Sequence, residues 1–187
     1  MPETTTIIGA GTMGAGIAQV AARHGWNVRL VDVDAGLVAA AIAGIGRRFD
    51  RLVEKGRLGA DEAAAATARL TAAAGADAYT DTDLVIEAVV ERLEVKNAVF
   101  SAALPHLKPG AILATNTSSL SVGAMGDAIG CPERVVGMHF FNPVPLMPLV
   151  EIISGERTDA DLADRAFAIA EGWGKIVVRA NDTPGVI

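Results

Sequence analysis

One stretch near the start of the chain, GAGTMGAG at Gly9–Gly16, restricts the fold more than any other feature of the sequence. It follows the apolar run Thr4–Ile8, which is typical of a strand, and opens an alanine-rich stretch that is typical of a helix. Gly9 permits a tight turn, Gly11 has no Cβ to obstruct a pyrophosphate, and Gly14 lets the helix lie close to the strand. The G-x-G-x-x-G spacing predicts a dinucleotide-binding turn, although a simple tight turn can have the same glycines.

The next predicted strand, Asn27–Val31, is followed by Asp32, about 20 residues after the glycines, where an acidic residue binds ribose hydroxyls in this type of fold. Free N–H groups at the start of the predicted helix 12–23 favour phosphates. We therefore expect NAD as the cofactor. Asp32 favours NAD over NADP, because its carboxylate would accept a hydrogen bond from the 2′-hydroxyl and repel a 2′-phosphate.

The composition excludes several classes of protein. The chain has 187 residues, enough for one substantial core, and 51% of them are hydrophobic. Its net charge of −6 argues against a nucleic-acid or membrane-surface partner, and no apolar stretch reaches the roughly 18 residues that a spanning helix needs. The single cysteine, Cys131, excludes an internal disulfide and a cysteine-built metal site, and the sequence has no other metal-binding pattern. We expect a soluble, cytoplasmic protein.

Strands and helices alternate along the chain, which predicts a Rossmann-type, doubly wound α/β fold with a mostly parallel sheet and helices on both faces. Further strands are expected at residues 77–80, 84–89, 112–114, 134–138, 149–153 and 176–178, and further helices at 93–104, 121–129 and 159–171. The segment after the second strand carries two more predicted helices, 34–55 and 61–73, whereas a minimal crossover needs only about a dozen residues. We expect a projecting helical hairpin there, with two ordinary surface helices as the alternative.

Polar clusters follow five of the predicted strands. They are Gly9–Gly14, Asp32, Glu91, Asn116–Ser119 and His139–Asn142. In a parallel sheet, ligands bind beyond the carboxyl ends of the strands. The five clusters therefore predict one shared crevice.

His139 is the candidate general base, because imidazole exchanges protons near neutral pH and the residue ends a predicted strand. Glu151 comes 12 residues later, after a proline-rich, non-helical loop at 140–148, so the two side chains can come together. A carboxylate on one ring nitrogen would fix the tautomer of the imidazole. The alternatives are a core histidine bonded to a carbonyl, and a solvated charge at the edge of a strand, which the apolar neighbours of Glu151 make less favourable.

Three other polar residues have two interpretations each. Ser118 and Ser119 lie in a turn after a strand, where a hydroxyl either caps a helix or donates to a substrate oxygen. Lys96 lies on the predicted helix 93–104, where it is either an ordinary i, i+4 neighbour on the Arg92 or Glu91 side of the helix or a contact to a cofactor. The spacing does not decide between these interpretations.

The sequence resembles the NAD-binding domain of the L-3-hydroxyacyl-CoA dehydrogenase family over essentially all 187 residues. The matching stretches are IIGAGTMGAGIAQVAARHG, LVDVD, DLVIEAVVERLEVKNAVF, ATNTSSLSV, GMHFFNPVPLMPLVEII and DTPG. HFFNPVP, preceded by NTSSL and followed by a glutamate 12 residues after the histidine, is far more specific than the glycines.

The resemblance implies a role for individual residues. His139 would be the general base, Glu151 its partner, Ser118 a contact to the 3-oxygen, and Asn142 a neighbour of the nicotinamide and the reacting carbon. The implied cofactor-binding residues are Gly9, Gly11, Thr12, Met13, Gly14, Asp32, Glu91, Lys96, Asn116, Ser118 and Asn142. The helical hairpin lies near coenzyme A in such enzymes, which implies contacts from Arg48 and Lys55. Pro148 stands where several relatives have a lysine.

The reaction that the resemblance implies is oxidation of a (3S)-3-hydroxyacyl-CoA to a 3-oxoacyl-CoA with NAD, as in fatty-acid or aromatic-acid degradation. Family enzymes continue into a C-terminal helical domain that makes the homodimer, much of the acyl pocket and an active-site asparagine. Residues 1–187 are therefore expected to be the NAD-binding domain, and to bind NAD with little turnover when alone. The rival functions are a related sugar-acid or carnitine dehydrogenase and a non-catalytic, crystallin-like protein.

Overall fold

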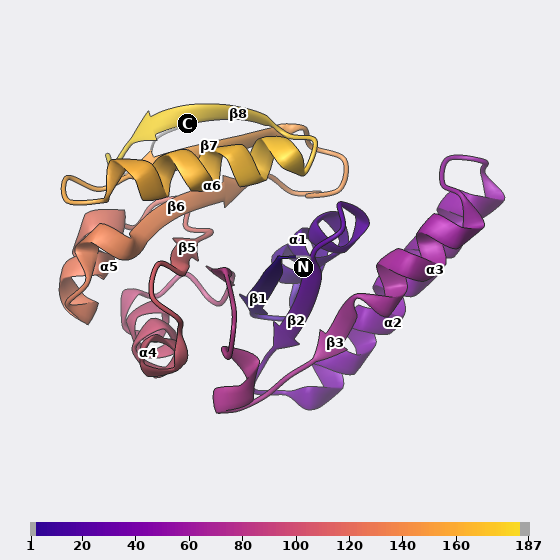
Figure 1. Ribbon diagram of the computed structural model, residues 1–187, viewed down its shortest axis with the longest axis horizontal. Coiled ribbons are helices and arrows are strands. Elements are labelled where there is room, and N and C mark those ends of the chain that lie inside the picture. Colours follow the sequence, from indigo (N-terminus) through magenta and orange to yellow (C-terminus); the bar gives the residue numbers. More distant parts are fainter. Residues whose placement is uncertain (1–2, 184–187) are drawn as a thin grey trace.

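The computed structural model describes residues 3–183, which form an α/β fold around one eight-stranded sheet (Figure 1). The strands lie in the order β3-β2-β1-β4-β5-β6-β7-β8. Their bounds are β1 Thr4–Ile8, β2 Asn27–Val31, β3 Leu70–Ala72, β4 Leu84–Glu87, β5 Ile112–Thr115, β6 Val135–Phe140, β7 Leu149–Ser154 and β8 Ile176–Asn181. All neighbours pair in parallel except β6 and β7. The predicted fold class is confirmed.

Six α-helices and three short 3₁₀ helices connect the strands within the described residues. The α-helices are α1 Thr12–Arg23, α2 Ala35–Glu54, α3 Ala60–Ala68, α4 Leu93–Ala103, α5 Val122–Ile129 and α6 Ala160–Gly172, and the 3₁₀ helices are η1 Ala76–Ala78, η2 Leu104–His106 and η3 Pro132–Arg134. None of these helices combines the length and the apolar character needed to cross a membrane.

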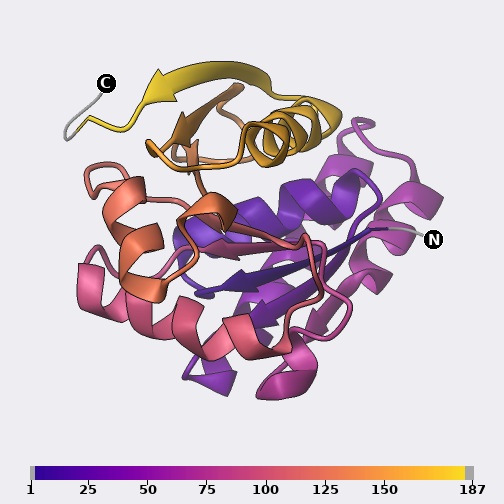
Figure 2. The ribbon, with the colours of Figure 1, turned by 60° about the vertical axis from the view of Figure 1, so that its left-hand side comes forward.

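The sheet separates two hydrophobic cores. Adjacent residues of a strand point to opposite faces, so Ile7 joins a core with α1, α2, α3 and α6, while Ile8 joins one with α4 and α5. Both faces of the central strands are thus buried, which explains their nearly continuous apolar sequences. Figure 2 shows α4 and α5 on the opposite side of the sheet from α1.

Helices α2 and α3 lie side by side as a hairpin whose connecting turn points away from the sheet (Figure 1). Asp34 begins α2, because its Oδ1 accepts hydrogen bonds from the N–H groups of Gly36 and Leu37. Phe49 and Ile45 are fully buried on the inner side of α2, which attaches the hairpin to the rest of the domain.

One predicted helix end and one predicted strand between 61 and 80 are wrong. The helix expected at 61–73 ends at Ala68, because Leu70–Ala72 forms β3 and pairs with β2. The strand expected at 77–80 is instead the 3₁₀ helix η1. Pairing with the free edge of β2 satisfies backbone groups and buries Leu70, and this tertiary gain outweighs the helix propensity of the alanines.

Candidate active site

The glycine turn has the geometry that its sequence predicts. Gly9 has a φ of +108°, and a Cβ there would lie 2.6 Å from the carbonyl oxygen of Ala88. A Cβ on Gly14 would lie 1.8 Å from the carbonyl oxygen of Gly9, so the helix can approach the turn only with glycine at this position. A Cβ on Gly11 would have no atom of the described residues within 4 Å, so the chain is open there. Space over Gly11, beside the N-terminus of α1, fits a pyrophosphate.

Asp32 lies directly beside this turn. Its Oδ2 accepts a hydrogen bond from the N–H of Ala10 at 2.8 Å, and its Oδ1 accepts one from the N–H of Asp34 at 3.1 Å. The carboxylate is therefore fixed between the end of β1 and the end of β2, and its side chain stays partly exposed. This position fits contact with the ribose of a bound dinucleotide.

A pocket of about 340 Å³ lies at the carboxyl ends of the central strands. It is lined by Met13, Ala88, Val89, Glu91, Asn116, Ser118, His139, Phe140, Phe141 and Asn142. The structure thus brings four of the five predicted polar clusters to one pocket, from the segments after β1, β4, β5 and β6. Asp32, the fifth, borders the glycine turn instead. We call this the central pocket.

His139 and Glu151 are direct partners in the antiparallel register of β6 and β7. The Nδ1 atom of His139 lies 2.8 Å from Oε2 of Glu151, and both residues are more than nine-tenths buried. A carboxylate can only accept a hydrogen bond, so Nδ1 donates, and in the neutral imidazole Nε2 then keeps a free electron pair. Glu151, and not a backbone carbonyl, is thus the partner of the imidazole.

The turn after β5 is held by Glu91. The carboxylate of Glu91 accepts hydrogen bonds from the Thr117 hydroxyl, from the N–H of Ser118 at 3.1 Å, and from the Ser119 hydroxyl at 3.4 Å. Helix α5 is capped by the hydroxyl of Ser121, and neither Ser118 nor Ser119 does so. Ser118 is exposed at the central pocket, so its hydroxyl is available to a bound molecule.

Asn116 connects two strand ends. Its Oδ1 accepts a hydrogen bond from the N–H of Phe140 at 2.8 Å, which ties the end of β5 to the end of β6. The backbone that carries His139 is thereby fixed relative to the turn that carries Ser118.

Lys96 forms a buried ion pair next to Glu91, and its second partner, Glu87, was not predicted from the sequence. The Nζ atom of Lys96 lies 2.6 Å from Oε1 of Glu87 and 3.0 Å from Oε2 of Glu91. Glu87 and Lys96 are essentially inaccessible to solvent, and Glu87 also accepts a hydrogen bond from the Thr115 hydroxyl. Lys96 therefore binds Oε2 of Glu91, whereas the turn after β5 binds Oε1. The available signal was an acidic residue inside the apolar strand β4, where an unpaired carboxylate would be costly.

These contacts lower the pKa of the Glu91 carboxyl. Partial burial raises the pKa of its carboxyl, but the hydrogen bonds from Thr117 and Lys96, the charge of Lys96 and the bond from the Ser118 backbone together lower it below its ordinary value. The ionised form of Glu91, which is the form that holds the turn, is thus favoured.

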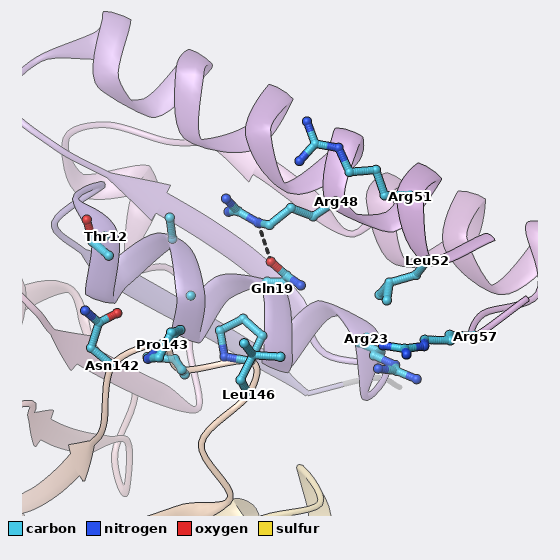
Figure 3. Close-up of a pocket in the computed structure, with 14 residues that line it drawn as sticks. Thr12, Gln19, Arg23, Arg48, Arg51, Leu52, Arg57, Asn142, Pro143 and Leu146 are labelled. Carbon is cyan, nitrogen blue, oxygen red and sulfur yellow. Dashed lines mark hydrogen bonds between the residues drawn. The ribbon is translucent and has the colours of Figure 1, made fainter. Parts of the chain in front are cut away.

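A second pocket, of about 640 Å³, lies between α1, α2 and the loop after β6 (Figure 3). Four arginines line it, together with Thr12, Gln19 and the loop residues from Asn142 to Leu146; the arginines are Arg23, Arg48, Arg51 and Arg57. We call it the arginine pocket. Such a concentration of positive charge in a chain of net charge −6 favours a ligand with phosphate groups.

Arg48 is fixed in this pocket by Gln19. The Nε atom of Arg48 donates to Oε1 of Gln19 at 2.6 Å, which leaves its terminal nitrogens for other acceptors (Figure 3). Burial and the charges of Arg47 and Arg51 lower the pKa of the Arg48 guanidinium. Lys55, the other expected contact, is the exposed C-cap residue of α2 and does not line the pocket. Helix periodicity places Arg48 and Arg51 on neighbouring turns, but the contributions of Arg23 and Arg57 depend on tertiary packing.

Residues 4–183 match the family described as 3-hydroxyacyl-CoA dehydrogenase, NAD binding domain. The chain belongs to this family. The predicted resemblance is thereby confirmed, and NAD is confirmed as the cofactor of this NAD-binding family. No group of His, Cys, Asp and Glu that could hold a metal ion occurs among residues 3–183.

Relatives in this 3-hydroxyacyl-CoA dehydrogenase family are substantially longer than the chain. This chain is 45% identical over 185 residues to the 3-hydroxyadipyl-CoA dehydrogenase of Escherichia coli (strain K12), and the match covers 99% of this chain and 39% of that protein. It is 42% identical over 181 residues to the 3-hydroxybutyryl-CoA dehydrogenase of Bradyrhizobium diazoefficiens, covering 97% of this chain and 62% of that protein.

Solved structures of the family are closely similar in fold. The crystal structure of 3-hydroxybutyryl-CoA dehydrogenase from Escherichia coli K12 has a TM-score of 0.95 at 45% identity, covering 99% of this chain and 39% of that one. That of (S)-3-hydroxybutyryl-CoA dehydrogenase from Ralstonia eutropha has a TM-score of 0.94 at 36% identity, covering 99% and 65%.

Proposed function

We propose that this protein is an NAD-dependent 3-hydroxyacyl-CoA dehydrogenase, which converts a (3S)-3-hydroxyacyl-CoA to a 3-oxoacyl-CoA. The observation that carries the proposal is the buried His139–Glu151 pair, whose histidine lines the central pocket together with Ser118 and Asn142. The names of the relatives support the same substrate class.

His139 is the proton acceptor in this proposal. Its Nδ1 is engaged by Glu151, so Nε2 is the atom that removes the proton of the 3-hydroxyl. The Glu151 carboxylate then stabilises the positive charge that the imidazole gains. Because the two residues are partners across β6 and β7, the ring keeps one orientation throughout. NAD, when bound, supplies the acceptor for the hydride from C3.

The other residues of the central pocket orient the reacting carbon. Ser118 is held by Glu91 through its backbone, so its hydroxyl is free to donate to the 3-oxygen. Asn142 lines both the central pocket and the arginine pocket, which supports a role for it between the nicotinamide and the substrate. Gly9, Gly11 and Gly14 would hold the pyrophosphate.

The arginine pocket would take the coenzyme A part of the substrate. Arg48, presented by Gln19, is the proposed phosphate contact, and the apolar loop beyond Asn142 would line the path from the phosphates to the central pocket. Lys55 remains a predicted contact at the outer end of the hairpin.

The resemblance further suggests the setting of this domain. We infer that residues 1–187 are the NAD-binding part of a cytoplasmic homodimer, whose subunits join through a helical domain of the kind that family members carry. Residues 1–187 alone would then bind NAD with little turnover.

Replacing His139 tests the proposed chemistry. His139→Gln in the complete enzyme should lower kcat for 3-hydroxybutyryl-CoA by about 10²–10⁴-fold, because the general base is lost. NAD affinity should stay nearly unchanged, because the glycine turn and Asp32 are untouched. Steady-state kinetics and NAD titration measure the two effects. The control is His106→Gln, an exposed histidine of η2 outside both pockets.

Two results would contradict the proposal. One is loss of NAD binding with unaffected chemistry, which would make His139 structural. The other is a wild-type enzyme that oxidises free 3-hydroxy acids as well as their CoA thioesters, which would favour the sugar-acid or carnitine dehydrogenase alternative.

A further inference from the structure

The loop between β6 and β7, residues 141–148, forms a wall of both pockets. Asn142 lines the central and the arginine pockets, and the residues from Pro143 to Leu146 line the arginine pocket. Pro145 and Leu146 also border a further hollow of about 440 Å³ on the side of Lys175. Apart from Val144 and the partly buried Phe141, the side chains of this loop are exposed. The position of the loop therefore sets the shape of both pockets, and it must be fixed by contacts from outside.

On one side the loop packs against α1. Val144 is buried, and a Cβ on Gly16 would lie only 2.8 Å from the Val144 Cβ. Glycine at position 16 thus lets the loop lie directly on the helix that follows the dinucleotide turn.

On the other side the loop is held by Lys175. The Nζ atom of Lys175 donates to the carbonyl oxygen of Val144 at 2.6 Å and to that of Met147 at 2.8 Å. These acceptors lie 31 and 28 residues earlier in the chain. Within the described residues no carboxylate lies within salt-bridge distance of Lys175. Among the described residues, both hydrogen bonds of this ammonium therefore go to the backbone of one loop.

The backbone around Lys175 is well anchored. Trp173 is fully buried; its ring lies edge-on against Trp26 at 5.5 Å and stacks on Phe140 at 6.3 Å between centroids. The N–H of Lys175 bonds to Ala170 at the end of α6. The Lys175 ammonium thus extends from the well-packed segment between α6 and β8 to a loop that is otherwise mostly exposed.

We propose that Lys175 is a positioning residue that clamps the 141–148 loop and so sets the width of the arginine pocket. Its two carbonyl bonds fix the loop at Val144 and Met147, and this keeps the wall of the arginine pocket in place for the coenzyme A part of the substrate. The assignment of coenzyme A to that pocket rests on the proposed function. The clamp itself rests on the two bonds and can be measured without any substrate.

Three variants test the clamp. Lys175→Met removes the donor and keeps the chain length, Lys175→Arg keeps a charged donor, and Lys108→Met is the matched control. Lys108 is also a partly buried lysine, bonded to Asp83 at 2.6 Å, and it lines neither pocket. If Lys175→Met does not fold, Lys175→Gln replaces it, because its amide retains a neutral donor.

The exchange rates of the loop amides measure how firmly Lys175 fixes the loop. The N–H groups of Leu146 and Met147 bond to the Pro143 carbonyl inside the loop. Lys175→Met should speed their exchange about tenfold, with Lys175→Arg close to wild type and Lys108→Met without effect on the loop. Unchanged exchange in Lys175→Met, or faster exchange spread evenly over the sheet, would overturn the proposal.

Calorimetric titration of the complete enzyme with free coenzyme A and with NAD gives the second readout. Lys175→Met should weaken coenzyme A binding about tenfold and change NAD affinity less than about twofold, with recovery in Lys175→Arg. Equal losses for both ligands would overturn the positioning role. A wild type that does not bind coenzyme A would refute the substrate assignment, whereas the exchange experiment would still decide the clamp.

Discussion

At the scale of single residues, Asp32 is expected to choose between the two nicotinamide dinucleotides. Its carboxylate is fixed by the N–H groups of Ala10 and Asp34, beside the glycine turn. The next residues, Val33 to Gly36, include no arginine that could receive a 2′-phosphate. The 2′-phosphate of NADP would therefore lie beside the Asp32 carboxylate, and no cation of this segment would neutralise it.

Asp32→Ser should shrink the preference for NAD over NADP by about 10-fold or more, because it removes the repulsion of the 2′-phosphate and a charged acceptor for the 2′-hydroxyl. The measurement is the ratio of the two dissociation constants. Asp77→Ser, an exposed aspartate on η1, is the control. An unchanged ratio would show that another residue recognises the ribose.

The sequence predicted the His139–Glu151 contact, but it did not predict the contact of Lys175 with the 141–148 loop. His139 and Glu151 lie 12 residues apart, so the sequence could bring them together through one turn. Lys175 and the loop carbonyls are about 30 residues apart, and a lysine at the start of a strand resembles any surface charge. Only the packing of α6 and β8 on β7 brings its ammonium to the loop.

At the scale of elements, Glu91 connects the end of β4 to the turn after β5 and to helix α4. Its carboxylate accepts from Thr117 and Ser118 on one side and pairs with Lys96 on the other. Burial opposes its ionisation, but these bonds prevail, so the pKa of Glu91 lies below its ordinary value. A carboxyl whose pKa is lowered by folding stabilises the folded state above the unfolded-state pKa.

The pH dependence of stability tests this contact. The contribution of Glu91 should be complete above about pH 4.3, the ordinary value for glutamate, and be lost as the pH falls through the lower pKa of the folded state. The free energy of unfolding of Glu91→Gln should thus approach that of wild type as the pH falls through this window. Glu94→Gln, on an exposed position of α4, is the control. A constant difference between wild type and Glu91→Gln at all pH values would contradict the assignment.

Element-level prediction was accurate for the buried strands and the capped helices, and it failed at the edge of the sheet. Helix α1 begins and ends where the glycines and the periodicity predict, at Thr12–Arg23. Strand β3 has three residues, of which only Leu70 is buried, so its sequence carries almost no strand signal. Its existence depends on the free edge of β2, which a local pattern cannot reveal.

At the scale of the whole molecule, the distribution of charge is uneven. The chain has 22 acidic and 16 basic residues, yet four arginines surround one pocket. An acidic surface repels a polyphosphate at long range, so binding depends on short-range contact with these arginines. Salt screens the attraction between these arginines and a phosphate, with a Debye length of about 10 Å at 0.1 M.

Coenzyme A binding should therefore weaken as salt rises, and Arg48 should account for part of that dependence. Arg48→Met should lower coenzyme A affinity about tenfold at low ionic strength, because a charged donor held by Gln19 is lost, and should flatten the salt dependence. NAD affinity should change little, because Arg48 does not line the central pocket. Titrations at several salt concentrations compare it with Arg47→Met, an exposed neighbour outside the pocket. Equal behaviour of the two variants would mean that total charge, and not the geometry around Arg48, attracts the phosphates.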